Sequence, residues 1–150
     1  QAGASNEGIK KAMGSLIYRL DSDDYIAENT LLFLSEILLQ NSDIGFVYAD
    51  NIRIDENEGF IERVNIDTID KLFAHGAGIM FRKSYLERIG LYDETMKHAD
   101  DYDLLKRYLK NFDGYRLRLP LYRYRQSCKS ITLKGKRAEF IKKSDKKNAK

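Results

Sequence analysis

Residues 16–24 read Leu-Ile-Tyr-Arg-Leu-Asp-Ser-Asp-Asp, and this stretch decides the expected fold. Its first five residues are mostly apolar and predict a short strand, which delivers Asp21, Asp23 and Asp24 at its carboxyl end. In open α/β sheets, ligands bind in the crevice at the carboxyl ends of the strands. We therefore expect the ligand site at this point of the chain.

The acidic cluster indicates a metal site. Three carboxylates within four positions repel one another unless a cation neutralises them. A hard divalent ion such as Mn²⁺ or Mg²⁺ takes oxygen ligands and bridges a diphosphate. Two alternatives stay open: the acids cap the helix expected from about Ala27, or they belong to a phosphohydrolase. An EF-hand loop is excluded, because its sixth and twelfth positions would be Ile26 and Leu32 instead of glycine and glutamate.

Strand and helix patterns alternate along the chain and predict an α/β domain with a mainly parallel sheet. Strands are expected at 16–20, 44–48, 52–54, 60–64, 78–81 and 115–124. Helices are expected at 6–13, 28–39, 69–73, 83–89 and 100–111. A turn at 56–59 predicts a hairpin between two of the strands.

Two further segments offer chemistry. Asp100 and Asp101 begin the helix expected at 100–111, where acids either complement the helix dipole or supply a general base for an attacking hydroxyl. Gly76-Ala77-Gly78 precedes a strand, and glycines there let the backbone approach a ligand closely. The neighbouring His75 is expected to be structural.

Composition fits one globular domain, with 150 residues of which 43% are hydrophobic. The single cysteine, Cys128, excludes an intrachain disulfide and favours a reducing compartment, so we expect a cytoplasmic protein. Residues 129–150 carry a net charge of +7, against −4 for residues 1–128. We divide the chain into a domain at 1–131 and a loose basic C-terminal tail at 132–150. The tail suits peripheral contact with the inner face of a membrane, and no nucleic-acid partner is expected.

In order and spacing, four segments resemble glycosyltransferase family 2, the inverting group with the GT-A fold. The first is 3–14, with its Asn-x-Gly-Ile and Ala-x-Gly pattern, and the second is the Asp-x-Asp stretch at 20–24. The third is 76–83 with the Ile-Gly-x-Tyr-Asp-Glu continuation at 89–94, and the fourth is the Asp-Asp-x-Asp-Leu box at 100–104. The resemblance covers about residues 2–132 and implies a GT-A-like mixed sheet.

The resemblance implies a metal-dependent enzyme that moves a sugar, with inversion, from a nucleotide-diphospho-sugar to a carbohydrate, lipid-linked or protein acceptor. It makes Asp101 the catalytic base and Asp21 and Asp23 the ligands of Mn²⁺ or Mg²⁺. The donor-binding residues would be Asn6, Gly8, Asp21, Asp23 and Asp24. The acceptor-binding residues would be Gly76, Ala77, Gly78 and Asp100.

Several positions depart from the family pattern. Ser5 stands where the family often has arginine, and Gln126 or Ser127 stands where many relatives carry a metal-binding histidine. The chain has no tryptophan, so it lacks the Gln-x-x-Arg-Trp box of processive synthases, which favours single addition. The family's first two strands, which cradle the nucleotide, should precede Gln1. We therefore expect the C-terminal two-thirds of such an enzyme, an N-terminally truncated fragment with little activity alone. A non-catalytic remnant or binding subunit and a metal-dependent phosphohydrolase stay open as alternatives.

Overall fold

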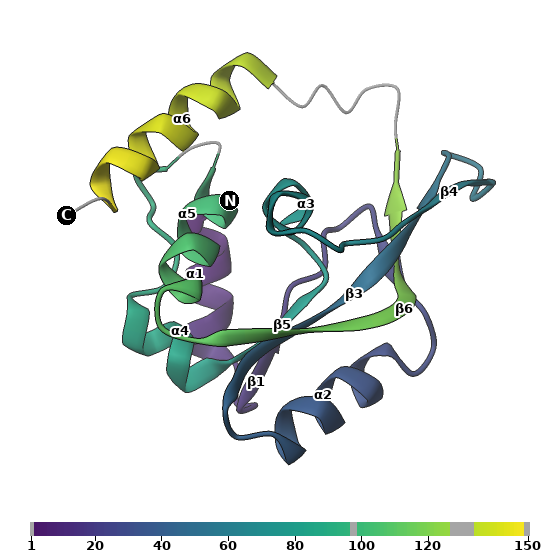
Figure 1. Ribbon diagram of the computed structural model, residues 1–150, viewed down its shortest axis with the longest axis horizontal. Helices are drawn as coiled ribbons and strands as arrows, with labels where there is room; N and C mark the ends of the chain where they lie inside the picture. Colours follow the sequence, from purple (N-terminus) through teal and green to yellow (C-terminus); the bar gives the residue numbers. More distant parts are fainter. Residues whose placement is uncertain (1, 97–98, 127–133, 149–150) are drawn as a thin grey trace.

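The computed structural model describes residues 2–96, 99–126 and 134–148, so Ser127 and Cys128 lie outside the described residues. A mixed six-stranded sheet carries helices on both faces (Figure 1). Its helices are α1 (Ala2–Lys11), α2 (Thr30–Gln40), α3 (Ile69–His75), α4 (Lys83–Ile89), α5 (Asp100–Leu109) and α6 (Lys134–Lys147). Its strands are β1 (Leu16–Tyr18), β2 (Tyr25–Ile26), β3 (Ile44–Ile54), β4 (Phe60–Val64), β5 (Ile79–Arg82) and β6 (Asp113–Arg125).

The sheet order is β1-β5-β3-β6-β2, and β4 pairs with β3 beyond this path. The expected α/β class with a mixed sheet flanked by helices is confirmed, but the expectation of mainly parallel pairing is wrong. Among the described strands only β3 and β6 run parallel, and the other four pairs are antiparallel. The turn between β3 and β4 is too short for a parallel crossover, which accounts for the antiparallel pairing of these two strands.

The two faces of the sheet have separate cores, because neighbouring residues of a strand point to opposite sides. Phe46 and Phe81 pack with the side chains of α1, α3, α4 and α5 on one face. Val47 and Met80 pack with Leu34 and Leu38 of α2 on the other. Among the described residues no helix combines the length and the apolar character needed to cross a membrane.

Strand β3 is longer than its sequence predicts. The sequence predicts one strand at 44–48 and another at 52–54, with Asp50 between them. In the structure β3 continues without a break to Ile54. The strand continues because Asp50, with no exposed side-chain surface, is fully compensated. Arg116 donates to its two carboxylate oxygens at 2.9 and 3.0 Å, and the backbone N–H of Ile66 donates at 2.9 Å.

A second arginine, Arg63 of β4, donates to Asp50 at 3.3 Å. Burial alone would raise the pKa of Asp50, but the hydrogen bonds from Arg116, Ile66 and Arg63 outweigh it and lower that pKa. One buried carboxylate therefore ties β3 to β4, to β6 and to the segment that leads into α3.

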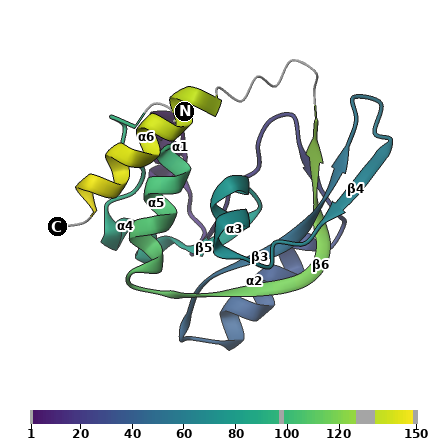
Figure 2. The ribbon, with the colours of Figure 1, turned by 45° about the horizontal axis from the view of Figure 1, so that its top comes forward.

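The described part of the 132–150 segment is not a loose tail. Its residues 134–147 form α6, which lies along α5 in both ribbon views (Figure 2). The fully buried Ser144 donates to Asp103 of α5 at 2.8 Å, and Lys147 pairs with Asp93 at 2.5 Å. This lysine lowers the pKa of Asp93 to about 2. Composition alone suggested a solvated terminus, because it does not reveal polar partners such as Asp103 and Asp93.

Replacing Asp50 with alanine should destabilise the fold by about 3–5 kcal/mol, because it leaves Arg116 and Arg63 beside a buried, uncompensated site. Urea unfolding at neutral pH measures the loss. Asp43→Ala, at an exposed acid just before the same strand, is the matched control and should change stability by less than about 0.5 kcal/mol. A loss below about 1 kcal/mol for Asp50→Ala would contradict the assigned role of the carboxylate.

Candidate functional site

The acidic turn at 21–24 follows β1, as the sequence predicts. The N–H of Asp24 donates to the carbonyl of Asp21 at 3.1 Å, which closes the turn. The carboxylate of Asp24 accepts from the hydroxyl of Tyr122 at 2.7 Å and from the N–H of Arg125 at 2.8 Å. Burial raises the pKa of Asp24 despite these bonds. Asp24, predicted to bind the donor, thus uses its carboxylate to attach the turn to β6.

Asp23 and Asp21 have different surroundings. Asp23 is exposed, and no described side chain pairs with its carboxylate. Asp21 is half-buried, and its Oδ1 accepts from Arg19 at 3.2 Å. Within the described ranges, no group of three or more His, Cys, Asp or Glu side chains is arranged to hold a metal ion by itself. The fit is nevertheless good for Mn²⁺ or Mg²⁺ held together with a phosphate ligand, because such ions commonly use one or two carboxylates and complete their shell with phosphate and water oxygens.

Arg19 is a site residue that the sequence analysis missed. Its guanidinium carbon lies 5.8 Å from the centre of the Tyr92 ring, and only 16% of its side chain is exposed. Burial alone would lower the pKa of Arg19, but the Tyr92 hydroxyl and the carboxylates of Asp21 and Asp101 outweigh it and raise that pKa. The available signal was a charged residue inside an otherwise apolar strand, since buried arginines are paired with acids.

The second acidic pair lies close to the first. Asp100 is buried, and its Oδ2 has no hydrogen-bond partner among the described residues. Asp101, which follows it at the beginning of α5, acts electrostatically on both Arg19 and Tyr92. Arg19 therefore lies between the acid at the end of β1 and the acids at the beginning of α5, two sets of residues about 80 positions apart in the chain.

The segment Gly76-Ala77-Gly78 joins these two acidic sets. Gly76 ends α3 in the left-handed conformation, with φ of 66°, and a Cβ added there would overlap the carboxylate of Asp101. The N–H of Gly78 donates to the carbonyl of Arg19 at 3.4 Å. The absence of a side chain at position 76 thus lets the backbone lie directly against Asp101. The structure brings together these predicted acceptor-side residues, Asp101 and the end of β1.

Asn6, predicted to bind the donor, makes long-range contacts within the protein. Its side chain is buried and exchanges two 2.9 Å hydrogen bonds with the backbone of Tyr92, while its amide also donates to Glu94 at 3.0 Å. These bonds hold α1 against the 92–94 segment. Both N–H groups of the amide are thus used within the protein, and Asn6 positions Tyr92. A short motif cannot reveal a partner 86 positions away, so these contacts were not predicted from the sequence.

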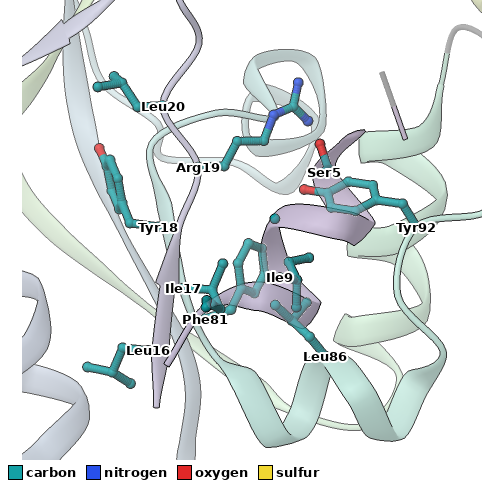
Figure 3. A pocket seen from close by; sticks show the side chains of 12 residues that line it. Ser5, Ile9, Leu16, Ile17, Tyr18, Arg19, Leu20, Phe81, Leu86 and Tyr92 are labelled. Carbon is teal, nitrogen blue, oxygen red and sulfur yellow. The ribbon is translucent and has the colours of Figure 1, made fainter. Parts of the chain in front are cut away.

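A groove of about 450 Å³ lies between α1 and β1 (Figure 3). The polar ends of Arg19, Ser5 and Tyr92 gather at one end of it. Gly8, predicted to bind the donor, also lines the groove, and a Cβ added there would meet no atom within 4 Å. The groove therefore leads from an apolar surface to the acidic site, with Arg19 at the point where they meet.

His75 adjoins the site through Gly76. It is half-buried beside the rings of Tyr122 and Tyr124, whose centres lie 5.1 and 5.8 Å away. Its Nε2 lies 3.1 Å from the amide nitrogen of Asn51. Burial, followed by the charge of Arg53, lowers its pKa to about 4. His75 is thus neutral at neutral pH and packs against neighbouring rings, in agreement with the structural role expected for it.

Asp103, the last acid of the Asp-Asp-x-Asp box, supports α5 from behind. Its fully buried carboxylate accepts from Arg107 at 2.8 Å and from Ser144 of α6 at 2.8 Å. Arg107 also donates to the carbonyls of Ile89 and Leu91. The helix that carries Asp101 is therefore fixed one turn further on to both α4 and α6. Gln126, one of the two residues found in place of the expected metal-binding histidine, is exposed, and its backbone N–H donates to the carbonyl of Ile54 at 2.8 Å.

Comparison with known sequences finds relatives named as uncharacterized glycosyltransferases, and no family model matches the chain. One from Rickettsia typhi is 29% identical over 122 residues, which are 71% of this chain and 38% of that protein. One from Haemophilus influenzae is 28% identical over 132 residues, which are 80% of this chain and 45% of that protein. The chain thus spans less than half the length of these relatives.

Two solved structures share the fold. The structure of S. aureus TarS 1–349 in complex with UDP matches with a TM-score of 0.66 at 17% identity, and the match covers 95% of this chain and 44% of that one. The mannosyltransferase PcManGT from Pyrobaculum calidifontis, in complex with GDP-Man and Mn²⁺, has a TM-score of 0.65 at 17% identity and covers 99% of this chain and 43% of that one. The fold described above is therefore that of part of these two proteins.

Lowering the pH from 7 to 5 should cost the wild-type fold about 2 kcal/mol through His75 alone. Its pKa in the folded state, about 4, lies below the unfolded value, so the unfolded chain binds the proton first. The contribution is complete above the unfolded pKa and is lost as the pH falls toward 4. Urea unfolding of wild type and His75→Gln at both pH values measures this difference. Equal slopes with pH for the two proteins would show that His75 is not a buried neutral group.

Proposed function

We propose that the chain is part of a glycosyltransferase that moves a sugar from a nucleotide-diphospho-sugar to an acceptor hydroxyl. The observation that carries the proposal is the meeting of two acidic sets at the end of β1, Asp21 and Asp23 on one side and Asp100 and Asp101 on the other. The similarity to proteins named as glycosyltransferases supports it. The fold shared with structures that contain UDP, or GDP-Man and Mn²⁺, is consistent with it.

Asp23 and Asp21 would hold a divalent cation together with the donor diphosphate. The cation would stabilise the negative charge that accumulates on the departing nucleoside diphosphate. The exposed carboxylate of Asp23 has no competing partner among the described side chains, which suits it to this role. The groove beside α1, lined by Gly8 and Arg19, adjoins this position and suits the remainder of the donor.

Asp101 would act as the general base. An acceptor hydroxyl must lose its proton as it attacks the anomeric carbon, and a placed carboxylate can accept that proton. Attack on the face opposite the leaving diphosphate would invert the configuration. The buried, unpartnered Oδ2 of Asp100 and the close backbone of Gly76 support an acceptor position next to Asp101. The acceptor would be a carbohydrate, a lipid-linked sugar or a protein.

Asp101→Asn should lower turnover by about 10²–10⁴-fold, because an amide cannot take the proton of the acceptor hydroxyl. Donor affinity should stay nearly unchanged. The assay measures sugar transfer and nucleotide release by the complete encoded polypeptide, with phosphate release followed in parallel to detect hydrolase activity. Asp70→Asn, which changes an exposed acid in the first turn of α3, is the matched control. An unchanged rate for Asp101→Asn would remove Asp101 from the role of base.

Asp23→Ala should abolish the Mn²⁺-dependent part of donor binding, because it removes an exposed strand-end carboxylate that has no competing partner among the described side chains. Calorimetric titration with UDP and with GDP, each with and without Mn²⁺, measures this dependence. Asp43→Ala removes an exposed acid elsewhere and should leave it intact. Mn²⁺-dependent binding that survives in Asp23→Ala would show that the metal is held elsewhere.

A further inference from the structure

The guanidinium of Arg19 pairs with Asp21, one of the two carboxylates proposed to bind the cation. Its Nε and its Nη2 both lie 3.2 Å from the same oxygen, Oδ1 of Asp21. A hydrogen bond between two charged groups is stronger than one between neutral groups. In this arrangement Arg19 contacts Oδ1 of Asp21 and offsets part of the negative charge of that carboxylate.

The guanidinium is held in place from its other sides. The Tyr92 ring lies below it at 5.8 Å, and the backbone of Tyr92 is fixed by the two hydrogen bonds from Asn6. The carbonyl of Arg19 accepts from Gly78, and its Nη1 is buried without a described acceptor. Arg19 is therefore set into the site, in contrast to a surface arginine that moves freely in solvent.

On the basis of the proposed function, we propose that Arg19 is a positioning residue that weakens the binding of a divalent cation at Asp21 until the donor diphosphate arrives. A divalent cation and a guanidinium on the same carboxylate repel each other. The diphosphate brings negative charge to both of them, and arginine matches phosphate oxygens well, so Arg19 gains a new partner as it leaves Asp21.

The chemical consequence is coupling between the two ligands. Each ligand must raise the affinity of the other, because binding free energies are linked reciprocally. A cation would then be retained mainly in the presence of the nucleotide. The buried Nη1, which has no described acceptor, provides an additional donor for an anionic group that enters at this point.

The test uses Mn²⁺ alone as the probe, with the free ion followed by electron paramagnetic resonance. Arg19→Gln should bind Mn²⁺ roughly tenfold more tightly than wild type, as expected for removing one positive charge about 5 Å from a divalent ion in a water-like environment. Arg19→Lys keeps the charge and should stay within about threefold of wild type. Arg19→Met preserves the apolar stem and should bind Mn²⁺ as tightly as Arg19→Gln. It takes the place of Arg19→Gln if Arg19→Gln does not fold.

A second titration adds UDP or GDP. Either nucleotide should raise the affinity for Mn²⁺ more in wild type than in Arg19→Gln. Equal or weaker Mn²⁺ binding by Arg19→Gln, or no Mn²⁺ binding by either neutral variant, would overturn the inference. The proposed donor site would still stand if Asp23→Ala abolished the Mn²⁺ dependence of nucleotide binding. Nucleotide binding that never depends on Mn²⁺ would overturn both.

Discussion

The structure depends on how one buried negative charge is compensated. Asp50 lies in the middle of the central strand with its side chain fully inaccessible to water. A carboxylate in that position is tolerated only when charged partners and N–H groups surround it. Those partners come from β6, β4 and the segment before α3, so compensating the charge also fixes the positions of three separate pieces of chain. The same β6 carries Tyr122, which holds the acidic turn, so the geometry of the site follows from the geometry of the sheet.

The candidate site is assembled mostly by backbone contacts and shared partners. The end of β1, the loop after α3 and the beginning of α5 meet because Gly76 has no side chain and Gly78 donates to the carbonyl of Arg19. Asp23 and Asp24 belong to the same sequence motif but have different surroundings. Asp24 attaches the turn to β6, whereas Asp23 faces solvent without a described partner. The role of each acid depends on the distant residues that contact it, and not on its spacing in the sequence.

Local patterns predicted a good part of this molecule. The 83–89 helix was predicted with its observed bounds, and the glycine at 90 ends it in the left-handed conformation. The acidic turn also lies at the end of its strand, as expected. Other features could not be predicted, because each depends on a polar partner far away in the chain. They are the continuous β3, the roles of Asn6 and Arg19, and the docking of α6. Hydrophobic periodicity reports which side of an element is buried, but it carries no information on which arginine meets which acid.

The parallel pairing of β3 with β6 has a consequence for how the molecule acquires its structure. The ladder joins residues 44–54 to residues 113–125, so most of the intervening chain must be present before it can close. Contacts between such distant positions slow folding, because the entropy of closing the loop is lost before the contacts form. During synthesis, β3 can pair with β4 and β5 before β6 has left the ribosome. The nascent chain therefore displays the edge of its central strand, and the charge of Asp50, until β6 is complete.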